Sequence, residues 1–336
     1  MELMSNEVMK SDAFQTKVKT MLGLTYLTRA ILDGFNGNHY ILKDIYVNST
    51  KNTSQIHYLG WDDPQKIPFY PDTDSYRGAT SGSKYNKELL VPNERMIEYD
   101  FAEAYTNIMR NYKLPSNVYL ENVRFDKEKL LERLASYDKP QPYKELSTFV
   151  FVKVAIEAIA KESTYTAFGS HFQQYRKNLS RTLTVTEIEL KLIMDFYDVK
   201  ALEILETYTF RTRKGLLEDY FEKIDRLKED EETKFFYKML RNKIYGTIGK
   251  RELSTHEAKI FKFPMYNRAF SSMVAGVFRD RIARYEQKYV DSEYGLVLIK
   301  TDGLYFKKEV PEFEALNKKG IVKKKVHVIT DHDVKN

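Results

Sequence analysis

The hydrophobic and polar positions of this chain form short segments whose periods indicate a mixture of strands and helices. Residues 95–101 (RMIEYDF) and 148–156 (TFVFVKVAI) have the apolar, β-branched and aromatic content of strands. Residues 102–109, 185–197 and 269–287 instead repeat their apolar positions at the helical period. Strand-like and helix-like runs are mixed between residues 145 and 215, so the pattern predicts an α/β stretch there.

Other segments of the chain also have patterns that predict local structure. Amphipathic segments at 215–228 and 233–246 predict two helices, and the short acidic turn EDEE between them favours antiparallel packing. The stretch LIKTDGLYF (298–306) has two apolar halves around Asp-Gly, which predicts a β-hairpin. Residues 1–75 contain one helical stretch, at 16–36, and then loosen into a polar connector with Pro and Asp.

Composition narrows the class of protein. With 42% hydrophobic and 30% charged residues, the 336-residue chain has an ordinary globular composition. The net charge of +6 favours a polyanionic partner if the basic residues cluster. The absence of cysteine excludes disulfides and thiolate metal sites. No apolar run approaches membrane-spanning length and the N-terminus lacks a signal peptide's apolar core, so we expect a cytoplasmic protein without a membrane partner.

Two features carry candidate chemistry on their own. The strand at 95–101 delivers Asp100 at its end, immediately before a helix, which is a common way to present an acid to solvent. In the helix at 233–246, the residues Lys234, Lys238, Asn242 and Tyr245 are spaced by four, four and three positions and therefore share one face. Two ammonium groups suit a triphosphate, and a ring suits a base pair. A solvated basic face with Tyr245 in the core explains the same spacing.

The order of three segments resembles family B DNA polymerases, most closely the small protein-primed enzymes of bacteriophages. YDFAEAY (99–105), KMLRNKIYG (238–246) and LIKTDGLYF stand where the family has D-x-x-S-L-Y-P, K-x-x-x-N-S-x-Y-G and Y-x-D-T-D-S. Upstream, SYRGATSG (75–82) resembles the family's Tyr-x-Gly-Gly loop, with Ala79 in place of the second glycine. The literal string DTDS at 72–75 precedes the first motif and has no flanking strand, so we predict a helix cap or a turn there.

The resemblance implies a DNA-directed DNA polymerase of phage replication, with protein priming, that transfers dNTPs to a primer 3′-hydroxyl. It implies two Mg²⁺ ions about 3.5 to 4 Å apart, with Mn²⁺ as a substitute. Asp100 and Asp302 are the implied catalytic acids, and they bind the metals together with Phe101. The implied nucleotide-binding residues are Tyr105, Lys234, Lys238, Asn242, Tyr245 and Arg226. The implied DNA contacts are Tyr76, Arg77, Gly78, Gly246 and Lys325.

The same resemblance implies an α+β fold, with a palm that contains an antiparallel sheet and helices, and with helical fingers. The expected parts are an N-terminal helical segment and connector (1–75), the first part of the palm (76–154), an insertion resembling the terminal-protein-contacting region (155–213), the fingers (214–262) and the second part of the palm (263–336). Neither exonuclease motifs nor a thumb are expected on this chain. The expected partners are primer-template DNA, dNTPs, a terminal protein, and a separate chain that bears the exonuclease or thumb.

Three departures from the family pattern put catalysis in question. The D-T-D of the third motif is Lys300-Thr301-Asp302 here, and the next residue is Gly303. A lysine about 6 Å from a divalent ion costs about 5 kcal/mol at an effective dielectric constant of about 20. In the first motif Glu103 replaces the family's serine, and we hypothesise that it pairs with Lys300 or takes the place of the lost carboxylate.

These departures leave alternative functions open. The first is an active polymerase, and the second is a catalytically impaired polymerase-like subunit that binds primer-template or terminal protein. A third, another palm enzyme such as a reverse transcriptase or primase, is disfavoured by the Lys-x-x-x-Asn-x-x-Tyr-Gly helix.

Overall fold

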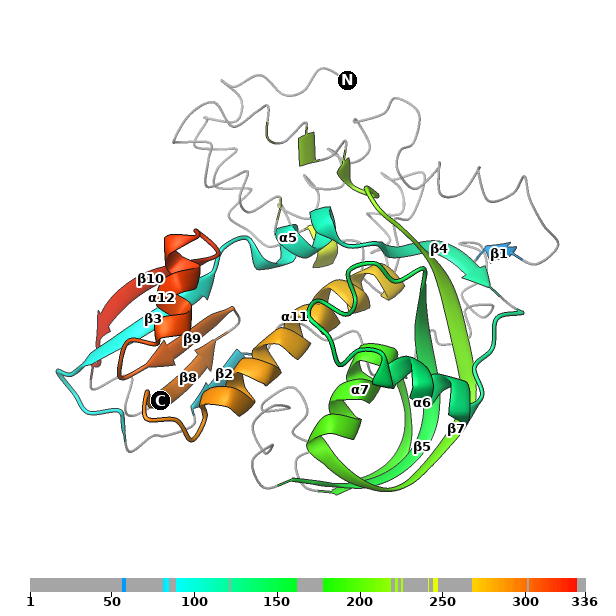
Figure 1. Cartoon of the computed structure of the whole chain (residues 1–336), viewed down its shortest axis with the longest axis horizontal. Helices are drawn as coiled ribbons and strands as arrows, with labels where there is room; N and C mark the ends of the chain where they lie inside the picture. Colours follow the sequence, from blue (N-terminus) through cyan, green and yellow to red (C-terminus); the bar gives the residue numbers. More distant parts are fainter. Residues whose placement is uncertain are drawn as a thin grey trace, which may run out of the picture.

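Two five-stranded antiparallel sheets lie on either side of one long helix in the computed structural model (Figure 1). The structure describes residues 56–58, 81–84, 89–120, 122–161, 178–218, 268–300 and 302–330, together with positions 221, 222, 225, 241 and 244–246. The predicted α+β fold is therefore confirmed, with antiparallel sheets and helices compatible with a polymerase palm-like domain.

The first sheet, here called the palm-like sheet, carries the predicted acids. Its strands in spatial order are β10 (Val322–Val328), β3 (Arg95–Phe101), β9 (Gly303–Phe306), β8 (Leu296–Lys300) and β2 (Ser81–Lys84). Successive side chains of a strand point to opposite faces. Ile97, Tyr99 and Phe101 accordingly point to one face and are buried there. Glu98 and Asp100 therefore point to the opposite face, which is the face of the candidate site.

Two helices cover the apolar face of the palm-like sheet. They are α11 (Arg268–Tyr289) and α12 (Pro311–Lys318), and both lie in front of the sheet in Figure 1. The ring of Phe313 on α12 stacks on Tyr99 with 5.1 Å between centroids, and Phe278 on α11 meets Phe101 edge to face at 5.9 Å. These aromatic contacts fix the strand that ends in Asp100 against a rigid support.

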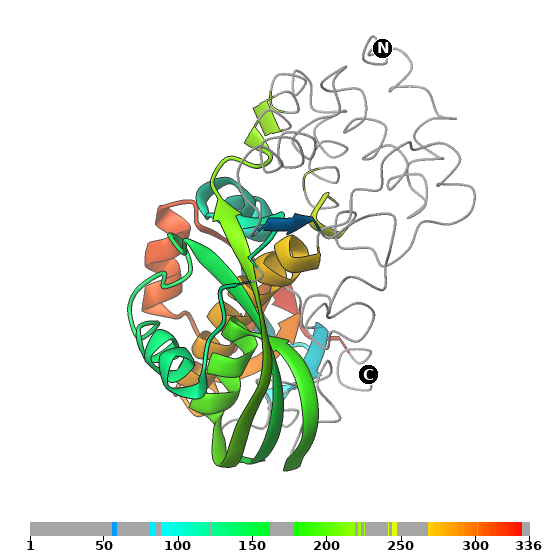
Figure 2. The ribbon, with the colours of Figure 1, turned by 90° about the vertical axis from the view of Figure 1, so that its right-hand side faces the viewer.

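The second sheet, here called the long-stranded sheet, contains the longest strands of the described chain. Its order is β1 (Ile56–Tyr58), β4 (Leu114–Leu120), β7 (Tyr197–Arg213), β5 (Thr148–Ala160) and β6 (Asn178–Thr186). Helices α6 (Lys127–Ala135) and α7 (Glu187–Phe196) pack beside it. Figure 2 shows how strongly its long strands, drawn in green, are curved.

Local sequence explains where the helices of this region begin. α7 begins at a capping box, in which the Thr186 hydroxyl accepts a hydrogen bond from the backbone N–H of Glu189 and the Glu189 carboxylate accepts one from the backbone N–H of Thr186. α6 begins at Asp126, whose carboxylate accepts from the backbone N–H of Lys129. Glu189 also pairs with Arg279 of α11, which ties the long-stranded sheet to the central helix.

Most element predictions that fall on described residues are confirmed. β3 has the predicted bounds, α5 (Ala104–Asn111) follows it, and α11 matches the predicted helix at 269–287. The described positions within 218–225 and 241–246 are helical, as predicted. The predicted helix at 16–36, the connector and the turn at 72–75 lie outside the described residues.

The domain boundaries remain predictions. β5 continues without interruption through the predicted boundary between 154 and 155. None of the described helices is both long and apolar enough to span a membrane.

Candidate active site

The two predicted acids lie close together, with Asp100 on β3 and Asp302 in the turn that leads into the neighbouring strand β9. Asp100 pairs with Gly303 in the antiparallel register of β3 and β9. Asp302 directly precedes Gly303 in the sequence and therefore lies next to the cross-strand partner of Asp100. The backbone N–H of Phe101 donates a hydrogen bond to the carbonyl oxygen of Asp302 at 3.0 Å, which extends the pairing into the turn. Asp302 lies in the two-residue turn between β8 and β9, which confirms the predicted hairpin. Both acids are partly exposed.

A third carboxylate lies on the same face. Glu98 is two residues before Asp100 and is only 7% exposed. It accepts hydrogen bonds from the Tyr305 hydroxyl at 3.0 Å and from Nε2 of His327, and the ammonium group of Lys325 lies 3.5 Å away. Burial opposes ionisation of Glu98, but the hydrogen bonds from His327 and Tyr305 and the nearby charges outweigh it, so the pKa of Glu98 lies below its usual value.

Sequence reasoning missed Glu98, although a signal for it exists. Strand alternation places every second residue before Asp100 on the face of that acid, and position 98 is the first of these. The acids that share this face also raise the pKa of Tyr305. It is raised by burial first, and then by the charges of Glu98, Asp100 and Asp302.

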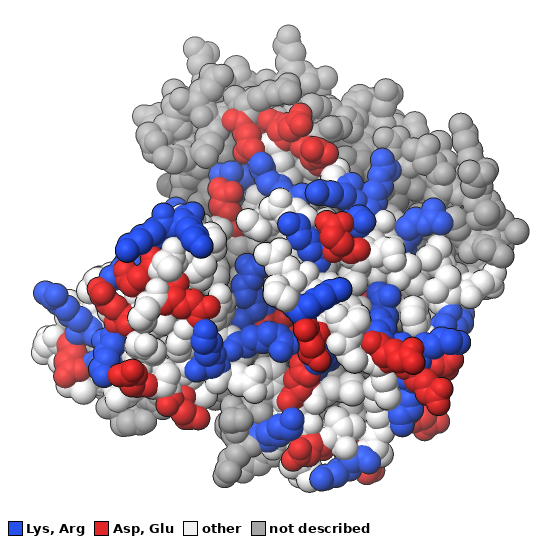
Figure 3. Space-filling view, in the orientation of Figure 1, with Lys and Arg blue, Asp and Glu red and all other residues white. Residues whose placement is uncertain are grey.

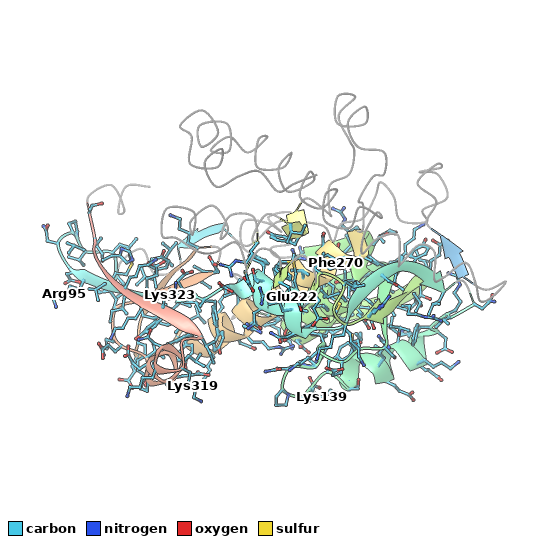
Figure 4. All side chains as sticks on the ribbon, turned by 90° about the horizontal axis from the view of Figure 1, so that it is seen from above. Arg95, Lys139, Glu222, Phe270, Lys319 and Lys323 are labelled. Carbon is cyan, nitrogen blue, oxygen red and sulfur yellow. The ribbon has the colours of Figure 1, made fainter. Side chains whose placement is uncertain are left out.

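Lysines flank the acids on both sides. Lys323 of β10 pairs with Asp100, and Lys300 of β8 pairs with Gly303; both side chains are exposed. Figure 4 shows Lys323 on β10, beside β3, and Arg95 at the far end of β3. Because neighbouring strands are about 4.8 Å apart, Lys300 lies about 10 Å from Asp100 along the sheet.

The structure corrects the expected pair of Glu103 and Lys300. The Glu103 carboxylate lies 3.0 Å from the guanidinium of Arg241, and no ion pair joins it to Lys300. The physical reason is that the Arg241 side chain is only 7% exposed and needs acidic partners, which it finds in Glu103 and in Asp225 at 3.4 Å. Within the described part of the chain, no three His, Asp or Glu side chains form a group that could hold a metal ion.

Two tyrosines stack on each other near the acids, and one of them, Tyr105, is buried in the hydrophobic core. Tyr105 of α5 stacks on Tyr245 with 4.5 Å between ring centroids and 9° between ring planes. Burial raises the pKa of Tyr105 well above its usual range, and the proximity of Tyr245 and Asp302 raises it further. Burial is also the main cause of the raised pKa of Tyr245. The structure thus brings together two residues that lie 140 positions apart in the sequence.

The remaining site predictions divide into two groups. Among described residues, the ring of Phe101 is buried on the helix side of the sheet, Gly246 follows Tyr245 in a helical turn, and Lys325 lies on the acid-bearing face beside Glu98. Tyr76, Arg77, Gly78, Arg226, Lys234, Lys238 and Asn242 lie outside the described residues.

The antiparallel palm-like sheet and its helices define a DNA polymerase-like fold. The chain is similar to Phi29 DNA polymerase complexed with single-stranded DNA, with a TM-score of 0.57 and 17% identity over 85% of this chain and 48% of that one. It is also similar to Phi29 DNA polymerase complexed with primer-template DNA and incoming nucleotide substrates, with a TM-score of 0.53 and 18% identity over 81% of this chain and 49% of that one.

At such identity the likeness establishes the fold alone, and the chain spans about half the length of these polymerases. No family model and no curated protein matches the sequence.

Proposed function

We propose that the chain carries out template-directed DNA synthesis as a family B polymerase of the protein-primed phage type. The observation that carries the proposal is the cross-strand pairing of Asp100 with Gly303, which sets the acids of two distant motifs next to each other. Beside them, the partly exposed ring of Tyr245, stacked on the buried ring of Tyr105, adds an aromatic surface of the kind that supports a nucleotide ring.

The donor set at this site fits a divalent cation that prefers oxygen ligands, because two carboxylates lie together and are partly exposed. Asp100 and Asp302 would hold Mg²⁺ together with the backbone carbonyl of Phe101. When bound, the metal supplies Lewis-acid activation of a primer hydroxyl and neutralises charge on the phosphates. Glu98 holds Lys325 and His327 on the same face, next to the path that a primer backbone would follow.

In this proposal the cationic residues of the fingers bind the triphosphate. Lys234, Lys238 and Arg226 contribute ammonium and guanidinium groups, and Asn242 and Gly246 border the nascent base pair. Tyr76, Arg77 and Gly78 contact the template backbone. A terminal protein would contact residues 155–213, which include the end of β5 and all of β6 and β7.

Primer extension tests the proposal. A primer-template and dNTPs are incubated with the wild type, Asp100→Asn or Asp302→Asn in the presence of Mg²⁺ or Mn²⁺. Either substitution is expected to reduce extension about a thousandfold, equivalent to about 4 kcal/mol of transition-state stabilisation. Asp291→Asn is the matched control, because Asp291 is exposed in the turn after α11. Equal extension by wild type and both acid variants would contradict the proposal.

One observation favours a second function, that of a polymerase-like subunit that binds DNA without synthesis. Lys300 and Lys323 flank the acids, so two ammonium groups already lie on the surface that would attract metal ions. Wild-type protein that binds primer-template but extends it with neither Mg²⁺ nor Mn²⁺ would establish this second function and exclude the first.

A further inference from the structure

A cavity of about 390 Å³ lies between α11 and the loop at 137–143, away from the acids. Its lining combines cationic and aromatic side chains, and includes Lys139, Tyr143, Arg281, Arg284, Tyr285 and Lys288. Arg281 and Tyr285 lie against the ring of Phe101, at 5.8 Å and 5.7 Å from its centroid. That ring is on the helix side of the palm-like sheet, whereas Asp100 is on the other side. The cavity is thus separate from the candidate active site.

Figures 3 and 4 agree with the position of the cavity on the helix side of the palm-like sheet. Figure 3 shows basic side chains gathered in the middle of one face, over α11. In Figure 4, Lys139 lies at the lower margin of the molecule, on the side where Lys319 follows α12, whereas Lys323 lies higher on β10.

The loop that forms one wall is held in place at both ends. The rings of Tyr137 and Tyr143 meet edge to face, with 5.0 Å between centroids. The Tyr137 hydroxyl donates to Glu187, and the Tyr143 hydroxyl donates to Asp280 at 3.4 Å. Between two prolines, Gln141 adopts φ of +51°, a conformation that non-glycine residues seldom adopt. The wall is therefore preformed, which reduces the entropic cost of binding a ligand.

The cations of the lining differ in whether they have acidic partners. Arg284 lies 3.0 Å from both Asp280 and Asp195, and Lys288 lies 2.6 Å from Glu312. Within the part of the chain that the structure describes, Lys139 and Arg281 have no acidic partner. The lining holds four cationic and two acidic side chains, and one of these acids, Asp138, pairs outside it with Lys191 at 2.9 Å. The cavity thus has an excess of positive charge that faces open space.

We propose that this cavity binds a small ligand that carries a chain of phosphate groups, such as pyrophosphate or a nucleotide. The planar fork of Arg281 matches two phosphate oxygens, and the Lys139 ammonium adds a point charge on the opposite wall. The volume lies in the range of small-molecule sites, about 300 to 1,000 Å³. The ring of Tyr285 offers an aromatic surface for a base. This inference stands whether or not the chain is an active polymerase.

Calorimetric titration of the full chain with inorganic pyrophosphate, and separately with ATP, tests the inference. EDTA is present so that the acids of the candidate active site cannot bind the phosphates through a metal ion. The double variant Lys139→Gln/Arg281→Gln is expected to bind each probe at least about tenfold more weakly, because each side chain supplies a charged hydrogen bond. The matched control is Arg95→Gln/Lys308→Gln, which removes the same two charges at exposed positions and is expected to bind as the wild type does.

The two probes distinguish the source of the ligand. Equal affinity for pyrophosphate and ATP indicates recognition of the phosphate chain alone, whereas tighter binding of ATP indicates a nucleotide whose base contacts the aromatic wall. Arg281→Lys keeps the charge but loses the fork, so an intermediate loss is expected even if the double variant folds poorly. Asp100→Asn is expected to bind pyrophosphate normally. Failure of the wild type to bind either probe at millimolar concentration, or equal binding by the double variant, would overturn the inference.

Discussion

Two buried carboxylates have different surroundings: Glu187 lies on a helix beside the long-stranded sheet, and Glu98 lies on a strand of the palm-like sheet. Glu187 of α7 is fully buried and accepts from Arg133, from the Tyr137 hydroxyl and from the backbone N–H of Val150 at 3.0 Å. All its donors belong to the packed region around α6 and β5. In the palm-like sheet, Glu98 is nearly as buried, but the side chains of its partners Lys325 and His327 are 53% and 40% exposed.

This difference in exposure distinguishes a carboxylate that only stabilises the fold from one whose cationic partners can still contact a ligand. A buried carboxylate whose donors are all internal holds elements together, and its removal leaves a buried cation without a partner. A carboxylate whose cationic partners reach solvent holds them in position without covering them. Asp100 extends this second pattern, because its neighbour Lys323 is also exposed. Substitutions in the first region should therefore alter stability, and substitutions in the second should alter binding or activity.

The largest effect is expected for Glu187→Ala. Loss of this carboxylate leaves the Arg133 guanidinium, whose side chain is 17% exposed, without its acid, and we expect the free energy of unfolding to fall by about 3 to 5 kcal/mol. Urea unfolding measures this change. Glu157→Ala, at an exposed position on β5, is the matched control and should change stability by less than about 0.5 kcal/mol. A loss below about 1 kcal/mol for Glu187→Ala would remove the contrast between the two regions.

The elements of the palm-like sheet were predictable because their signals are local. A strand that ends in Asp100 and a hairpin around Asp302 follow from side-chain alternation and turn chemistry, which need only a few neighbouring residues. The adjacency of these two strands was predictable only through the order of the motifs. The partner of Glu103 was not predictable, because Arg241 is 138 positions away and the choice between Arg241 and Lys300 depends on tertiary packing.

The two buried carboxylates show the same limit. Nothing near Glu187 in the sequence indicates that Arg133, 54 positions earlier, packs against it. In contrast, the face of the sheet to which Glu98 points is predictable, because Glu98 lies two residues before Asp100 on the same strand. The direction of a strand side chain is thus predictable from sequence, whereas its cross-sheet donors are not.

A smaller effect is expected for Lys300→Asp, which places an acid where the third motif of family B polymerases has one. The substitution replaces a positive charge about 10 Å from Asp100 by a negative one, and after solvent screening we expect half-saturation at about tenfold lower Mg²⁺ concentration. Primer extension at a series of Mg²⁺ concentrations measures it. Lys308→Asp makes the same charge change at another exposed lysine. An equal shift in both variants would assign the effect to net charge rather than to the hairpin.

Lys325→Ala should weaken primer-template binding by about three- to tenfold and reduce the slope of log affinity against log salt by about one, because one phosphate contact is lost. Unfolding by urea should change little, since the side chain is half exposed. Fluorescence anisotropy with labelled duplex at several salt concentrations provides the measurement. Lys319→Ala removes an exposed lysine after α12 and serves as the control. Equal slopes for the two variants would place Lys325 outside the DNA contact.

The smallest effect concerns the pH dependence of stability at Glu98. Because its pKa in the folded protein lies below the usual value of 4.5, ionised Glu98 stabilises the fold above that value, and the contribution is lost as pH falls through the folded-state pKa. Wild type should therefore exceed Glu98→Gln in stability by about 1 kcal/mol at pH 7, since the glutamine loses its charge-assisted hydrogen bonds. The difference should shrink as urea unfolding is repeated from pH 5 down to pH 3. A stability difference that stays constant over this pH range would mean that Glu98 stabilises the fold through packing rather than through its charge and the contacts with His327 and Lys325.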